Sequence, residues 1–61
     1  MTYYWAQVNA YKLAMGCYFV VKDNETLEDV VDRHFENGVI VAREVVTKEY
    51  AEKHMRRGIF R

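Results

Sequence analysis

The sequence predicts a small α+β protein: a three-stranded antiparallel sheet with one main helix on one face and a short C-terminal helix. Three observations support this fold class. Apolar residues alternate with other residues with a period of two over residues 3–11 and 15–22, which is typical of strands. The apolar period changes to three and four over residues 24–37, which is typical of an amphipathic helix. A β-branched apolar run over residues 39–46 then predicts a third strand.

The two alternating segments are expected to pair as a hairpin, with the turn near residues 12–16. No Asn-Gly or Asp-Gly pair marks this turn, so the sequence leaves the register open. Each strand has two distinct faces. Those of the first strand are Tyr4, Ala6, Val8 and Ala10 on one side, and Tyr3, Trp5, Gln7, Asn9 and Tyr11 on the other. Those of the second strand are Met15, Cys17, Phe19 and Val21, opposite Tyr18, Val20 and Lys22.

Both helices have recognisable ends. Asn24 or Thr26 can cap the main helix, since a side-chain oxygen there accepts hydrogen bonds from the unpaired N–H groups of the first turn. Asn37-Gly38 predicts its end, because Gly tolerates the left-handed backbone that follows a last turn. A short helix is then expected over residues 48–57, with Thr47 as its cap.

The expected strand order is 2-1-3, because a hairpin followed by a crossover helix places the third strand beside the first. The main helix then covers only one face of this sheet. The opposite face is expected to hold the aromatic side chains Tyr3, Trp5, Tyr11 and Tyr18. The C-terminal helix, a second subunit or a partner covers that face, or it stands exposed, and we expect a partner to cover it at least in part. Ile59 and Phe60 also need cover, from the core or from a partner.

Length and charge bound the class of protein. The 61 residues, 1–61, are enough for a single small domain. Nine Lys and Arg balance nine Asp and Glu, which disfavours a strongly basic nucleic-acid binder and an acidic DNA mimic. The charges are separated along the chain, with an acidic stretch over residues 23–37 and a basic excess over residues 38–61. The sequence shows no signal peptide, no membrane span and one Cys, so a cytoplasmic protein is expected (in the host cytoplasm if a phage encodes it).

The residue types that carry chemistry are isolated in this sequence. Cys17, His34 and His54 lack the paired spacing of metal ligands, and no catalytic motif is present. We expect Cys17 in the core, His34 at the boundary of the main helix and His54 on a solvated basic helix. Asp29 and Asp32 are expected on a solvated acidic face. We therefore expect no enzyme activity, no cofactor and no metal.

Residues 3–46 combine a first strand with Tyr4-Trp5-Ala6-Gln7-Val8, a second strand, an acidic helix that begins Glu25-Thr26-Leu27-Glu28, and a third strand. This layout resembles the small podophage inhibitors of host RNA polymerase. The resemblance implies a small phage-type protein that blocks a host protein by occupying its surface. In that family third-strand arginines contact the polymerase; Arg43 matches one such position, whereas Val45 stands two residues along. HicB-type antitoxins are also similar in the hairpin and the Thr-Leu-Glu helix start, but their pattern expects Pro-Gly in the second strand and this chain has no Pro.

We expect a non-enzymatic interaction protein from a phage or mobile element, which occludes a surface of a host complex in transcription or in an anti-phage defence such as CRISPR. Tyr, Trp and Arg dominate the energetics of protein interfaces. The expected partner-binding residues are Tyr3, Trp5, Tyr11, Tyr18, Arg43, Arg56 and Arg57. Two alternatives stay open. One is a small nucleic-acid-binding or transcription-modulating module, and the other is an antitoxin-like or structural homodimer.

Overall fold

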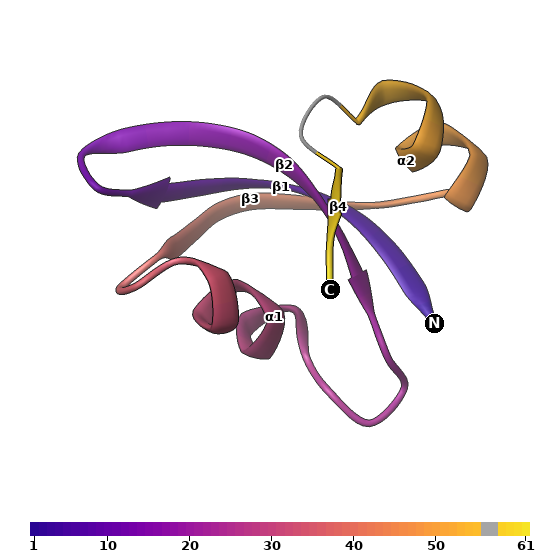
Figure 1. Ribbon diagram of the computed structural model, residues 1–61, viewed down its shortest axis with the longest axis horizontal. Helices are drawn as coiled ribbons and strands as arrows, with labels where there is room; N and C mark the ends of the chain where they lie inside the picture. Colours follow the sequence, from indigo (N-terminus) through magenta and orange to yellow (C-terminus); the bar gives the residue numbers. More distant parts are fainter. Residues whose placement is uncertain (56–57) are drawn as a thin grey trace.

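The computed structural model describes residues 1–55 and 58–61 and shows a sheet with two helices (Figure 1). The elements are β1 (Thr2–Ala10), β2 (Leu13–Val21), α1 (Leu27–His34), β3 (Val39–Val46), α2 (Lys48–His54) and β4 (Ile59–Phe60). The predicted α+β fold is confirmed. The strand order β3-β1-β2-β4 contains the predicted 2-1-3 arrangement of antiparallel strands. The short β4 adds a parallel strand beside β2, which makes the sheet four-stranded and mixed.

The core lies between α1 and one face of the sheet (Figure 1). Its largest fully buried side chains are Val8, Phe19, Val30 and Val31. They come from β1, β2 and α1, on the faces that the two periodicities predict. Cys17 is buried in the same cluster, as expected. The alternation of the strands and the stripe of the helix therefore meet in one apolar layer.

Phe60 joins the C-terminal segment to this core. Its ring centroid lies 5.5 Å from that of Phe19 and 5.3 Å from that of Phe35. The backbone of β4 runs parallel to β2, with Ile59 beside Tyr18 and Phe60 beside Phe19. Ile59 and Phe60 are thus partly covered by the protein's own core and sheet edge.

The hairpin turn lies earlier than predicted. Ala10 pairs with Leu13, so Tyr11 and Lys12 alone form the connection. Both residues have left-handed backbone, with φ of 54° and 63°, as in a type I′ turn. Asn and Gly are the usual residues at these positions, so the sequence carries no local signal for the turn. The prediction of a turn near residues 12–16 is therefore wrong.

The ends of α1 depend on Thr26 and Asn37. Thr26 is the cap: its Oγ1 accepts a hydrogen bond from the Asp29 N–H at 3.2 Å, and the Asp29 carboxylate accepts one from the Thr26 N–H at 2.9 Å. After the helix, Asn37 and not Gly38 takes the left-handed backbone, with φ of 56°. Gly38 is needed for space instead, because a Cβ there would lie 2.9 Å from the Cβ of Phe35 and 3.2 Å from Cγ1 of Val31.

On the other side of the sheet, α2 covers one end of the second face (Figure 1). Ala51 of α2 has no exposed surface, and Val20 of β2, on this face, is only 4% exposed. The helix ends at His54, because Met55 has extended backbone. The helix predicted over residues 48–57 included Met55, and the prediction is wrong at that residue. Arg56 and Arg57 lie outside the described residues. Within the described chain, neither helix has the length and apolar character of a membrane span.

The first prediction concerns the turn. Lys12→Gly is expected to raise the free energy of unfolding by about 0.5–1 kcal/mol. This figure is the strain that Gly removes from left-handed backbone, less the extra backbone entropy that Gly loses on folding. Urea denaturation of the two proteins measures this difference. Lys22→Gly, at an exposed lysine without left-handed backbone, is the control and is expected to gain nothing. A Lys12→Gly protein no more stable than the wild type would contradict the turn geometry.

The second prediction separates Asn37 from Gly38. Gly38→Ala is expected to lower the free energy of unfolding by about 1–3 kcal/mol, because the added methyl group overlaps Phe35 and Val31 in a packed core. Asn37→Gly is expected to leave stability unchanged or to raise it slightly, since Asn37 already has left-handed backbone. Thermal unfolding followed by circular dichroism tests both, and the reverse ranking would show that Gly38 is the residue that needs conformational freedom.

Candidate functional site

The candidate site is a row of side chains that crosses the sheet on the face away from α1. Glu44 of β3 lies directly opposite Trp5 of β1, and Trp5 lies directly opposite Tyr18 of β2. Cross-strand partners share a face of the sheet, so these three side chains stand side by side. Tyr50 of α2 approaches the row from above, with its ring centroid 6.3 Å from that of Tyr18.

These residues surround a hollow of about 600 Å³, which we call the aromatic pocket. It is lined by Trp5, Tyr18, Glu44, Val45, Val46, Thr47 and Tyr50. Four elements and the connection between β3 and α2 contribute to it. Trp5 and Tyr18 are half-buried, while Tyr50 is 48% exposed. The pocket is thus an open hollow with aromatic walls and one carboxylate.

Gly16 explains how the Trp5 side chain lies. A Cβ on Gly16 would be 3.0 Å from the indole Nε1 and 3.5 Å from Cζ2 of Trp5. The Nε1 side of the indole therefore lies over β2 at Gly16, the residue that pairs with Gln7 and is a diagonal neighbour of Trp5. A glycine at this point of the strand gives the ring room to lie close to the backbone.

Tyr50 is held by its own helix. Thr47 caps α2 by accepting a hydrogen bond from the Tyr50 N–H at 3.0 Å. His54, one turn later, stacks on the Tyr50 ring with centroids 4.0 Å apart, and its Nδ1 lies 2.9 Å from the Tyr50 carbonyl oxygen. His54 is exposed on α2, as expected for a solvated helix face, and its ring also supports Tyr50.

Electrostatics connect the members of the row. Burial raises the pKa of the Tyr18 hydroxyl, and the neighbouring Tyr50 and the Glu44 carboxylate raise it further, so Tyr18 stays protonated.

Arg43, next to Glu44 in sequence, points to the opposite face and forms an ion pair with Glu28 of α1. This pair lowers the pKa of Glu28 and raises that of Arg43. No ion pair within the described part of the chain reaches Glu44.

The structure brings together only some of the predicted partner-binding residues. Tyr3, Trp5 and Tyr18 share the face away from α1, as predicted. Tyr11 does not, because it lies in the turn and its hydroxyl accepts a hydrogen bond from the Glu36 N–H at 3.2 Å, at the end of α1. That assignment of Tyr11 to the aromatic face is wrong. Arg43 lies on the α1 side, and Arg56 and Arg57 fall outside the described residues.

Sequence reasoning missed Glu44 and Tyr50. The predicted strand order already places the third strand beside Trp5, but the partner of Trp5 depends on an irregularity in the register. Gln7 pairs with Ala42 and Val8 with Ile40, so Val41 is the extra residue of a bulge. Counting back two residues from Val46, which ends the third strand opposite Tyr3, locates Glu44 opposite Trp5. The sequence signal for Tyr50 is weaker: it is the residue three positions after Thr47, the cap of the short helix.

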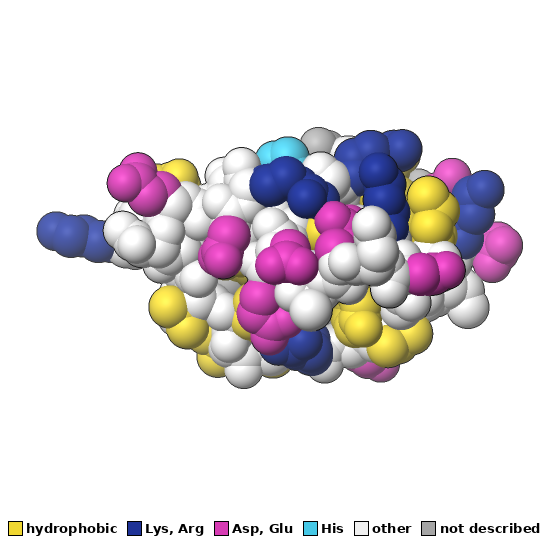
Figure 2. Space-filling view, turned by 90° about the horizontal axis from the view of Figure 1, so that it is seen from below, with side chains coloured by type: hydrophobic (Ala, Val, Ile, Leu, Met, Phe, Trp, Pro, Cys, Tyr) yellow, Lys and Arg dark blue, Asp and Glu magenta, His cyan; other side chains and the backbone are white. Residues whose placement is uncertain are grey.

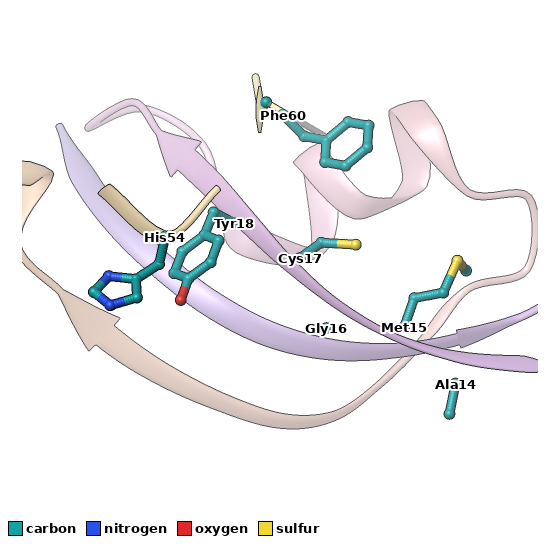
Figure 3. Close-up of a pocket in the computed structure, with 8 residues that line it drawn as sticks. Ala14, Met15, Gly16, Cys17, Tyr18, His54 and Phe60 are labelled. Atoms are coloured by element: carbon teal, nitrogen blue, oxygen red, sulfur yellow. The ribbon is translucent and has the colours of Figure 1, made fainter. Parts of the chain in front are cut away.

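A second hollow of about 330 Å³ lies at the edge of the sheet (Figure 3). Figure 3 shows Met15, Cys17 and Phe60 on one side of β2 and Tyr18 and His54 on the other. This hollow therefore runs past the strand edge and does not enter one face. Its other lining residues are Ala14, Gly16 and Gly58, which offer no polar side chain.

The remaining chemical candidates have structural roles. His34 Nε2 lies 2.8 Å from the carbonyl oxygen of Arg61, and its ring lies 5.0 Å from that of Phe60, so it is a boundary residue as predicted. Asp29 caps α1. Asp32 is exposed, as predicted. Figure 2 shows exposed acidic side chains in a broken band across the α1 side of the molecule. Among the residues that the structure describes, no group of three or more ligating side chains converges on a metal position.

Comparison of the chain with models of protein families, with curated proteins and with solved structures finds no match. The class that the structure supports is therefore the architectural one, a small α+β protein with a mixed four-stranded sheet and an open aromatic pocket.

The third prediction concerns the ion pair of Arg43 and Glu28. Because the folded-state pKa of Glu28 is lowered, the pair stabilises the protein above the ordinary Glu pKa of about 4.3, and this contribution is lost as the pH falls through the lowered value. Glu28→Gln is expected to cost less than about 1 kcal/mol at neutral pH and nothing in acid, because the pair is exposed. Urea unfolding between acid and neutral pH measures the difference, with Asp32→Asn as control. A loss that persists in acid would contradict this origin.

Proposed function

We propose that this protein is a small non-enzymatic interaction protein that inhibits a host protein complex by covering part of its surface. The observation that carries the proposal is the aromatic pocket, on a sheet face that α2 covers only at one end. Trp5 and Tyr18 are only half-buried there, whereas the core side chains on the α1 side of the sheet are buried. Half-exposed Trp and Tyr side chains that a partner can bury supply much of the binding energy of protein interfaces.

The edge of β3 supports the same proposal. β3 is the outermost strand on its side of the sheet. Val39, Val41 and Val45 are 60%, 56% and 64% exposed along it. An exposed edge with apolar side chains offers backbone N–H and C=O groups to another chain. Glu44 and Val46 belong to both the edge and the pocket, so one partner can cover the two features together.

Two further observations favour an interaction protein. The ring nitrogens of His34 and His54 contact backbone carbonyl oxygens, and Cys17 is buried in the core, so these side chains already have structural roles. The layout of residues 3–46 resembles small phage inhibitors, which act by occupying a host protein. Transcription and anti-phage defence are the host systems in which we place the target.

A second copy of the chain is the other candidate partner. The observation that favours it is again the free edge of β3, since two such edges can pair across a two-fold axis. A structural homodimer of this kind would close the β3 edge of both copies. The bulge at Val41 and the charges of Arg43 and Glu44 oppose it, because bulges and edge charges are the usual protection against strand pairing between copies.

The fourth prediction tests this function. Tagged protein incubated with bacterial lysate is expected to retain a host protein, identified by mass spectrometry, whose purified form rebinds and loses activity on binding. Trp5→Ala is expected to weaken this binding at least about tenfold, as for a residue at the centre of an interface. Tyr11→Ala is the matched control, because Tyr11 is an exposed aromatic residue outside the aromatic face.

Circular dichroism of each variant confirms that it is folded. Equal binding by the wild type and by folded Trp5→Ala would contradict the proposal. So would the retention of nucleic acid with a steep salt dependence, which would identify a nucleic-acid-binding module. Sedimentation showing a dimer that binds no other protein would favour the homodimer.

A further inference from the structure

We propose that the aromatic pocket binds a guanidinium group, namely an arginine side chain that the partner protein inserts between Trp5, Tyr18 and Tyr50 and beside Glu44. The inference rests on the proposed function, because it names the group by which the partner engages the aromatic face. It is argued from the rings, the carboxylate and the shape of the pocket.

The rings are arranged as open walls. Tyr18 and Tyr50 are tilted by 56° with centroids 6.3 Å apart, so they do not stack on each other. His54 supports Tyr50 on one side by stacking at an interplanar angle of 24°. Trp5 lies over Gly16 on the sheet. Aromatic faces attract cations within about 6 Å of the ring centroid, and Trp does so most strongly. Three rings from β1, β2 and α2 therefore line one hollow, and their faces suit a cation.

Glu44 supplies a negative charge at the same position. It pairs with Trp5 across β1 and β3, and it lines the pocket. Arg43 is its neighbour in sequence but is committed to Glu28 on the other face of the sheet. Within the part of the chain that the structure describes, no basic side chain neutralises Glu44. A cation that enters the pocket would therefore find both aromatic rings and an uncompensated carboxylate.

Guanidinium fits this combination better than other groups. It is planar, it stacks on aromatic rings, and it donates two parallel hydrogen bonds to one carboxylate. A lysine ammonium is compact and more strongly hydrated, so it makes less use of a broad pocket with several rings. A phosphate group would be repelled by Glu44, and a neutral apolar side chain would leave the carboxylate without a partner. The hollow of about 600 Å³ has room for an arginine side chain.

The test uses three short peptides with blocked ends: Gly-Arg-Gly, Gly-citrulline-Gly and Gly-Lys-Gly. Citrulline has the shape of arginine without its charge. Trp5 is the only Trp in the chain, so the indole N–H signal in an NMR spectrum comes from this ring, which lines the pocket. The arginine peptide is expected to shift this signal in a saturable way, and the citrulline peptide is expected not to. Gly-Lys-Gly is expected to bind more weakly than the arginine peptide.

Two variants show whether the binding uses the proposed groups. Glu44→Gln is expected to weaken binding of the arginine peptide about tenfold, the effect of one lost charge-assisted contact. Glu52→Gln, the same change at an exposed position of α2 outside the pocket, is expected to bind as the wild type does. Equal binding of the citrulline peptide, or unchanged binding by folded Glu44→Gln, would overturn the proposal.

The two proposals fail in different ways. A host protein whose capture is lost in Trp5→Ala but survives in Glu44→Gln would support the interaction function and overturn the arginine site. Selective binding of the arginine peptide, with no host protein captured, would support the guanidinium pocket and overturn the inhibitor function. Self-association that Glu44→Gln abolishes would show that a second copy fills the pocket, which overturns the assignment to a partner protein.

Discussion

The contact of Phe19 with Phe35 and Phe60 is the interaction on which the rest of the structure depends. Phe19 is fully buried in β2, Phe35 is the residue that ends α1, and Phe60 belongs to β4. Aromatic pairs at tilted angles and centroid distances of this kind bury large areas and add a directional preference. A chain of 61 residues with one Cys has no internal disulfide to hold its ends. The cluster therefore supplies the link between α1, the sheet and the C-terminal strand.

A core built on one side of the sheet has a direct consequence for the other side. The eight residues of α1 complete the layer against Val8 and Phe19, and nothing of that helix reaches the second face. α2 begins immediately after β3, at the cap residue Thr47, so it can reach only the end of the sheet where β3 finishes. The aromatic pocket occupies the border between the covered end and the open remainder. Tyr and Trp suit such a border, because each combines a large apolar surface with a polar atom.

The net charge of the chain is zero, but the two faces of β3 carry opposite charges. Arg43 and Glu44 are neighbours in sequence, but alternation along β3 sends their side chains to opposite sides of the sheet. Arg43 is compensated by Glu28 of α1, whereas Glu44 stands among aromatic rings. The same strand thus stabilises the contact between helix and sheet on one side and gives the pocket its charge on the other. The proposed binding of arginine follows from this division and not from the total charge.

The sequence by itself determined the first three strands, the two helices, the order of those three strands and their faces; it did not predict β4. The faces follow from a period of two or of three and four residues, which depends on local backbone geometry. The strand order follows from a hairpin followed by a crossover helix. It also determined that Trp5 and Tyr18 lie away from the core. The tertiary structure decided how these faces are completed. The turn at Tyr11 and Lys12 has no local signal, since pairing of the long strands imposes left-handed backbone on residues that do not prefer it. The bulge at Val41, the approach of Tyr50 to Tyr18 and the return of Phe60 join residues far apart in the chain. Such contacts depend on register and on which surfaces remain to be buried, and no local pattern encodes either.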